Sequence, residues 1–308
     1  LDSGFFGFMN ITSSISIMCE DHHGQVGVNA ISINTGANDV VVINGIDMDH
    51  RDVPLAAGIN FTGAGTLILR NSSIRHAQNG ILFAPAGSAK LVIDNTNFEG
   101  QTNAGVLIEP AASGTFQVNL DGVKSTNNLV GVSVAAGAGE TVNLEIRNSQ
   151  LQQNADFGLL SSTVGNGANN ANIDNSSVSN NVRGVQSVGA KSIVRINSSV
   201  FSRNNIGFVA ASGGSILSYG NNAVNSVSAI GGPTGGLDLR AAEALARETH
   251  LSPYFNRQRF VERLGCVRCH QRDTDRPPPI EAVGSTLGGA MMMAIPFQRT
   301  PRLTGPHQ

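Results

Sequence analysis

The stretch Ser192–Ala211, SIVRINSSVFSRNNIGFVAA, combines a short β-rich run, an Asn-Ser corner, a polar run, a glycine and a second β-rich run. Versions of this unit recur from near the first residue to about residue 225. Two sets of positions, the corner residues and the glycines, recur together at separations of about 22 to 27 residues. A repeat period in the twenties predicts a solenoid. The corners are Asn71, Asn95, Asp121, Asn148, Asn175, Asn197 and Asn221, and the glycines are Gly80, Gly105, Gly131, Gly158, Gly184 and Gly207.

Within each repeat, apolar and polar residues alternate over short runs such as LVID, VNLEI and SIVRI. Alternation with a period of two predicts strands that bury one face. Nothing between the runs has the helical periodicity that a parallel βαβ fold needs. We therefore expect residues 1–228 to form an all-β, right-handed parallel β-helix, in which each turn pairs with the turns above and below.

The repeated residue types have structural explanations. Asparagine tolerates a left-handed backbone, and its amide can bond to stacked neighbours, so the asparagine column predicts one corner of every coil. The glycine column predicts a second corner, where the chain needs a positive φ or a close backbone approach. We expect one narrow core, stacked from Ile74, Phe98, Val123, Leu151, Val178 and Val200.

Composition limits the partners. Of 308 residues 14% are charged, and the net charge is -2, which gives no electrostatic footprint for nucleic acid. The sequence contains no run of about twenty apolar residues, so it predicts no transmembrane segment. The chain starts at Leu1 without a signal peptide, so we interpret it as a fragment or a processed form.

The chain has three cysteines, too few for a disulfide framework. Cys19 lies in an apolar run and is interpreted as a small buried hydrophobic residue; the alternative is a disulfide to a cysteine outside this sequence. The other two cysteines lie together in the C-terminal part of the chain, where they raise the question of a cofactor or a metal.

The pattern changes after residue 228. Glycines and Pro233 predict a linker over residues 229–237. Asp238 is a candidate N-cap for LRAAEALARETH, and Ser252 with Pro253 starts a second helical run that Gly265 ends. Residues 238–308 are therefore predicted to form a small helical segment.

Cys266-Val-Arg-Cys269-His270 follows the second helical run. This Cys-x-x-Cys-His pattern is the signature of covalent c-type haem attachment, in which two thiols bind the haem and the adjacent imidazole is the proximal iron ligand. The same pattern occurs in zinc sites, which need a second pair of ligands, and in redox dithiols, which favour a βαβ setting. Both remain alternatives to haem c.

The context of this motif is similar to that of small class I cytochromes c. Phe260 lies six residues before the first cysteine, and Pro277, Pro278 and Pro279 follow the histidine, where the resemblance implies a proline carbonyl that orients the proximal ligand. The run LGCVRCHQRDTDRPPPIEAVGSTLGG also looks like haem c segments of larger secreted bacterial proteins. The distal candidates are Met291, Met292 and Met293, which lie unusually close to the motif. The alternatives are that these methionines only fill the core, that the haem segment is truncated, or that the iron is five-coordinate or has a histidine as its sixth ligand. The resemblance implies one-electron transfer and a redox partner.

The repeats also carry a resemblance. The runs ISIMCEDHHGQVGVNAISINTGANDVVVINGIDMD, ILRNSSIRHAQNGILFAPAG and ILSYGNNAV resemble secreted bacterial right-handed parallel β-helix repeat proteins of the pectate-lyase-like superfamily. That resemblance implies export to the periplasm, the cell surface or the medium. The alternative interpretation is that the chain is an extracellular polysaccharide-binding or carbohydrate-active protein, with a cell-surface glycan as its partner.

The repeats lack the paired acids that glycoside cleavage needs, so we assign no catalytic residue. Two clusters could meet on neighbouring coils, and solvated turn residues are the simpler interpretation of both. They are Glu20, Asp21, His22 and His23, and then Asp47, Asp49, His50, Arg51 and Asp52.

Overall fold

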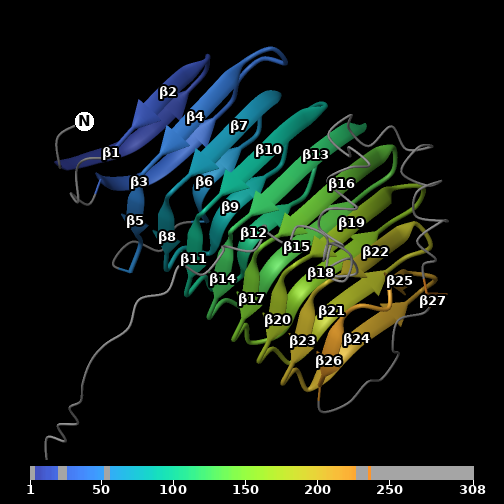
Figure 1. Cartoon of the computed structure of the whole chain (residues 1–308). Coiled ribbons are helices and arrows are strands. Elements are labelled where there is room, and N and C mark those ends of the chain that lie inside the picture. The colour runs from blue at the N-terminus through green and yellow to red at the C-terminus, as the bar shows by residue number, and fades with distance from the viewer. Residues whose placement is uncertain (1–3, 20–25, 52–55, 227–234, 237–308) are drawn as a thin grey trace, which may run out of the picture. The chain divides into compact units, whose positions relative to one another are not determined.

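The computed structural model describes residues 4–19, 26–51, 56–226 and 235–236 (Figure 1). These residues form an all-β parallel solenoid of about eight turns. Every strand pairs in parallel with the equivalent strand of the coil before or after it, which confirms the predicted parallel arrangement. The predicted helices over residues 238–308 lie outside the described residues.

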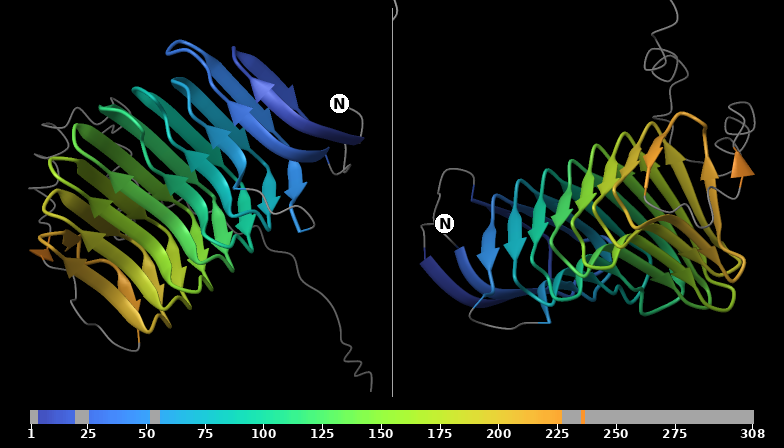
Figure 2. Two further views of the ribbon diagram at one scale, coloured as in Figure 1. Left: turned by 180° about the vertical axis from the view of Figure 1, so that it is seen from behind. Right: turned by 90° about the horizontal axis from the view of Figure 1, so that it is seen from below.

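The coils stack into three sheets (Figures 1 and 2). Sheet A contains β1 (Gly4–Ile11), β3 (Val26–Ile33), β6 (Ala57–Phe61), β9 (Asn79–Phe83), β12 (Ala104–Ile108), β15 (Val130–Ala136), β18 (Phe157–Thr163), β21 (Arg183–Val188) and β24 (Ile206–Ala211). Sheet B contains β2 (Ile15–Met18), β4 (Val40–Asn44), β7 (Gly65–Arg70), β10 (Ala89–Asp94), β13 (Gly114–Asp121), β16 (Glu140–Arg147), β19 (Ala168–Asp174), β22 (Ser192–Asn197), β25 (Ser215–Ser218) and β27 (Gly235–Gly236). Sheet C contains β5 (Asp47–Asp49), β8 (Ser73–Arg75), β11 (Asn97–Glu99), β14 (Lys124–Thr126), β17 (Gln150–Gln152), β20 (Ser177–Ser179), β23 (Val200–Ser202) and β26 (Ala223–Asn225).

The corner between sheets B and C is the predicted asparagine corner. Its residues adopt a left-handed backbone, with φ of 47° at Asn71 and 50° at Asn148. In three coils the left-handed residue is a neighbour of the predicted one. Gly122 and Ser198 follow Asp121 and Asn197, which pair within sheet B and end its strands, and Gly220, with φ of 81°, precedes Asn221. The prediction of Asp121, Asn197 and Asn221 as left-handed corner residues is therefore wrong by one residue in each case.

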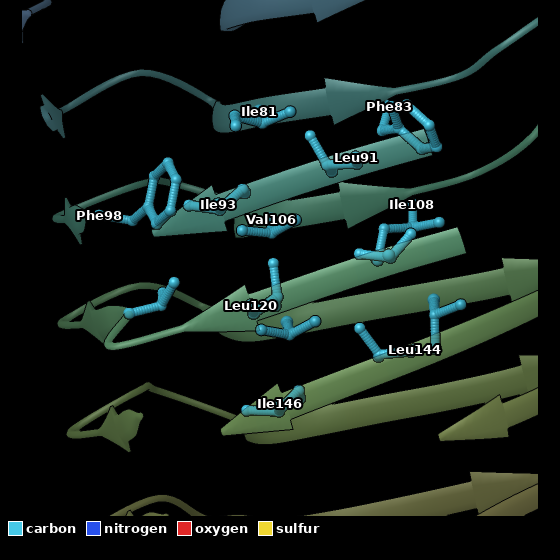
Figure 3. Close-up of a cluster of buried hydrophobic side chains, with 14 of the residues drawn as sticks. Ile81, Phe83, Leu91, Ile93, Phe98, Val106, Ile108, Leu120, Leu144 and Ile146 are labelled. Carbon is cyan, nitrogen blue, oxygen red and sulfur yellow. The ribbon is translucent and has the colours of Figure 1, made fainter. Parts of the chain in front are cut away.

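The interior is filled by the inward side chains of all three sheets (Figure 3). Ile74, Phe98, Val123, Leu151 and Val178 are fully buried, as predicted. The prediction that Val200 lies in the core is wrong, because its side chain is 45% exposed and Phe201 is buried in its place. The error follows from the shifted corner at Ser198, since a shift of one residue turns a strand over.

The prediction that the glycine column forms a second corner is wrong: its members lie within the strands of sheet A from β9 to β24. There they allow a close approach between sheets A and C. None of these glycines has a positive φ. A Cβ atom on Gly80 would lie 2.4 Å from Cδ1 of Phe98 and 2.5 Å from the carbonyl oxygen of Gly105. Of the two explanations drawn from the sequence, close approach is therefore the one that holds.

A ladder of buried amides runs along the corner between sheets C and A. Each side-chain oxygen accepts the backbone N–H of its counterpart in the preceding coil, with 3.1 Å from Asn128 N to Asn154 Oδ1 and 2.9 Å from Asn154 N to Asn181 Oδ1. Each side-chain nitrogen also donates to a carbonyl of the preceding coil. The members are Gln101, Asn128, Asn154, Asn181 and Asn204. The ladder satisfies polar groups that would otherwise be buried without partners.

The described chain ends at the edge of sheet B. Gly235 and Gly236, which fall in the predicted linker, pair in parallel with Leu217 and Ser218. Cys19 is buried, with 3% of its surface exposed, and carries a free thiol. Its interpretation as a small core residue agrees with this position.

Candidate functional site

The predicted haem residues cannot be placed on the solenoid. Cys266, Cys269 and His270 lie outside the described residues, as do Met291–Met293. Glu20, Asp21, His22, His23 and Asp52 are also outside them. The haem site, the distal ligand and the meeting of the two acidic clusters therefore stay predictions.

The described part of the second cluster lies on the outer face of sheet C. Met48 points inward and is buried, so Asp47 and Asp49 on either side of it point outward. Strand β8 places Arg75 opposite Asp49. Nη2 of Arg75 lies 2.8 Å from Oδ1 of Asp47, and Nε lies 3.7 Å from Oδ2 of Asp49. One guanidinium therefore bridges both carboxylates across two coils.

His76 completes this cluster. Its Nδ1 lies 2.8 Å from Oδ1 of Asp49. In the next coil a Cβ atom on Gly100 would lie 2.8 Å from Cδ2 of the imidazole. Glycine at this position therefore avoids a steric clash with the His76 ring. The hydrogen bond to Asp49 fixes the ring and directs Nε2 away from the carboxylate.

Two further residues of the predicted cluster contact the same strands. The backbone N–H of Arg51 donates to Asp49 Oδ1 over 3.1 Å, and its Nη2 lies 3.5 Å from Oδ2. His50 is only 3% exposed, and its Nδ1 lies 3.2 Å from the carbonyl oxygen of Arg75. The interpretation as solvated turn residues is therefore wrong for His50, which is buried, and for Asp47 and Asp49, which belong to strand β5.

The surroundings favour the ionised form of Asp49. Burial opposes ionisation, but it is outweighed by the hydrogen bonds from His76 and from the Arg51 backbone and by the charges of both residues. The net effect lowers the pKa of Asp49. Asp49 is thus a carboxylate over the physiological pH range.

This chemistry sets what the cluster can do. The general acid of a glycosidase needs a raised pKa, and the second carboxyl group must be free to act on water or on the sugar. Asp49 has the opposite shift, and Asp47 is held by Arg75. Within the described ranges no group of three or more His, Cys, Asp or Glu side chains could hold a metal ion. The cluster is an ion-pair network that joins neighbouring coils.

Sequence reasoning missed Arg75 and His76. They follow Asp49 and His50 by 26 residues, which is one coil period, so aligning the cluster on the repeat would have found both. The general signal is a charge of opposite sign one period away on the outward face of a short strand.

Comparisons with protein-family models, with curated proteins and with solved structures found no match to this chain. Among the described residues there is no helix long and apolar enough to cross a membrane.

Proposed function

We propose that this protein is an exported scaffold that carries a covalently attached c-type haem and transfers single electrons. The observation that carries the proposal is the motif Cys266-Val-Arg-Cys269-His270. Its donor set suits the group: two thiols of fixed spacing for the haem side chains and an adjacent imidazole for the iron. Phe260 and Pro277–Pro279 provide the sequence context of a haem c segment.

In this proposal, haem supplies one-electron redox chemistry when bound. Cys266 and Cys269 hold it, His270 is the proximal ligand, and one of Met291–Met293 is the candidate distal ligand. The solenoid is the rigid support. It winds right-handed, as parallel crossovers do in nearly all proteins, and belongs with the pectate-lyase-like β-helix proteins it resembles. Export agrees with both parts, because haem c is attached outside the bacterial cytoplasm.

The test is the absorption spectrum of the chain expressed with a haem c maturation system. The expected result is a Soret band and, after reduction, a sharp α-band, with a pyridine haemochrome that stays attached to the chain after denaturation. Both bands should disappear in Cys266→Ser/Cys269→Ser. They should remain in Cys19→Ser, because Cys19 is a buried free thiol in the solenoid. A folded chain without these bands would contradict the proposal.

Amide side chains on sheet B favour one second candidate, a polysaccharide-binding protein. In a strand, every second side chain points to the same face, and successive coils stack these positions into rows. The outward amides are Gln117, Asn119, Asn143, Asn170 and Asn172. Such rows offer donors and acceptors to sugar hydroxyl groups.

The glycan candidate is tested by affinity electrophoresis in gels containing neutral or acidic polysaccharides. The double variant Asn143→Ala/Asn170→Ala should lose retardation, whereas Ser73→Ala on sheet C should keep it. Equal mobility of all three proteins with and without glycan would contradict this candidate.

A further inference from the structure

Arg195 is an unpaired cation on the outer face of sheet B. It lies on β22 between Val194 and Ile196, which are fully buried, so its side chain points outward. Its neighbours in the register are Asn172 on β19 and Leu217 on β25. An amide and an aliphatic side chain thus flank it along the stack.

No described residue neutralises Arg195. Its side chain makes no hydrogen bond or ion pair with the described residues, and its Nε is buried without a hydrogen-bond partner. Arg147 on the same sheet differs, with Nη1 3.3 Å from Oε1 of Glu145 and Nε 3.8 Å from Oδ2 of Asp121. Burial also lowers the pKa of Arg195. Because arginine remains charged in proteins, a half-buried guanidinium without a counter-charge is costly unless something pairs with it.

Tyr219 follows Leu217, the register partner of Arg195, by two residues, and its phenol interacts electrostatically with the guanidinium. It follows β25, and its backbone N–H donates to the carbonyl of Ile196 over 3.2 Å. Burial raises the pKa of Tyr219. The positive charge of Arg195 opposes this rise, and the negative charge of Asp174 adds to it. The phenol is therefore a protonated hydrogen-bond donor at neutral pH.

The nearest acid is engaged elsewhere. Oδ1 of Asp174 accepts Nδ2 of Asn197 over 2.7 Å, in the amide chain of the corner. No ion pair joins Asp174 to Arg195 in the described part of the chain. The face thus presents a cation and a neutral donor next to each other.

We propose that Arg195 and Tyr219 form a binding site for an oxyanion, namely a carboxylate or phosphate group, on the outer face of sheet B. The guanidinium Nη groups donate to the anion and neutralise it, and the phenol hydroxyl supplies a further donor. The site shares no residue with the proposed haem site, and the proposal does not depend on haem binding.

Two sources can supply such an anion. One is a molecule from solution. The other is Asp238, Glu243 or Glu248, which are the first acidic residues in the sequence after the described chain ends at Gly236 beside Ser218. The chemistry at Arg195 is the same in both cases, so the experiment has to separate them.

The chain offers a specific reporter. It contains two tyrosines and no tryptophan, so Tyr254→Phe leaves Tyr219 as the sole tyrosine. Isotopic labelling of the ring carbon that bears the hydroxyl then gives one NMR signal. The full-length chain is titrated with sodium acetate or sodium phosphate against sodium chloride at constant ionic strength, which removes general screening effects.

The expected result is a saturable shift of the Tyr219 signal. Arg195→Gln should weaken the binding at least about tenfold, because it removes charge-assisted hydrogen bonds. The matched control Arg147→Gln should leave it unchanged, since Arg147 already has carboxylate partners. Arg195→Gln should also raise the pKa of Tyr219 further, because the charge that opposes its rise is lost.

A second arm identifies the source. If the anion comes from the chain itself, the shift is absent at first and develops in Asp238→Asn/Glu243→Gln/Glu248→Gln, which would support the site with an internal ligand. No saturable shift in either background, or the same shift with Arg195→Gln, would overturn the proposal. Circular dichroism of each variant checks that the solenoid is folded.

Discussion

Asn154 shows how a single side chain holds three coils together. Its Oδ1 accepts the backbone N–H of Asn128 over 3.1 Å, and its Nδ2 donates to Asn181 Oδ1 over 3.0 Å and to the carbonyl of Ser125 over 3.2 Å. All these atoms are buried, and a buried polar group without a partner costs about 1–3 kcal/mol. The ladder therefore stabilises the solenoid through the groups it satisfies.

Asn154→Ala is expected to lower the free energy of unfolding by about 2–5 kcal/mol, because it leaves several buried groups without partners. Asn143→Ala is the control: Asn143 is half-exposed on sheet B, where its Oδ1 accepts one bond of 3.2 Å, and it should cost less than about 1 kcal/mol. Urea unfolding monitored by circular dichroism measures both. Equal losses would contradict the role of the ladder.

Gly80→Ala tests the close approach of sheets A and C. The new Cβ atom would lie 2.4 Å from Phe98 Cδ1, so we expect a loss of about 1–3 kcal/mol. Gly87→Ala adds the same methyl group where nothing lies within 4 Å, and it should change stability by less than about 1 kcal/mol. Thermal unfolding of the two variants provides the comparison, and a neutral Gly80→Ala would mean that the sheets lie farther apart.

At the scale of the strand, Asp39 organises the turn that precedes β4. Its Oδ1 accepts the hydroxyl of Ser14 over 2.7 Å, and its Oδ2 accepts the backbone N–H of Gly36 over 2.8 Å. The bond from Ser14 and then that from Gly36 lower the pKa of Asp39, and slight burial opposes them. The turn depends on a carboxylate.

A lowered folded-state pKa gives a definite sign to the pH dependence. The contribution of Asp39 is fully present above the unfolded value of 3.8 and is lost as the pH falls through the folded-state value. Asp39→Asn should therefore reduce the acid-induced loss of stability, measured by urea unfolding at a series of pH values below neutrality. Asp94→Asn, an exposed change of the same kind, is the control. Identical pH profiles for Asp39→Asn and the parent chain would contradict the assignment.

The sequence predicted the strands better than their boundaries. The alternating runs LVID, VNLEI and SIVRI are strands of sheet B, whereas the glycines predicted to form a corner lie within the strands of sheet A. The sequence pattern misplaced the corners at Gly122 and Ser198, because Asp-Gly and Asn-Ser-Ser each offer two residues that tolerate the left-handed backbone. The buried amide ladder was missed, because neighbouring asparagines such as Asn127 and Asn128 do not reveal which one points inward. The bridge from Arg75 to Asp47 depends on register, which a single coil cannot show.

At the scale of the whole solenoid, one hydrophobic core runs through the described coils. A substitution that disrupts the packing of one coil should therefore also destabilise its neighbours. Val178→Asp puts a charge at a fully buried position and is expected to cost more than about 3 kcal/mol. Val164→Asp is the control, because Val164 is 74% exposed. Hydrogen exchange followed by mass spectrometry should show lost protection in β17, β20 and β23 together for Val178→Asp alone. Loss confined to β20 would contradict a shared core.

We propose that the redox chemistry of this protein depends on a haem bound at Cys266 and Cys269. Mass spectrometry of the intact, denatured chain after expression with a haem c maturation system tests it most directly. We predict a mass increase of one haem, carried after proteolysis by the peptide that contains Cys266–His270. Free thiols at both cysteines in the folded protein, with no added mass, would contradict the claim.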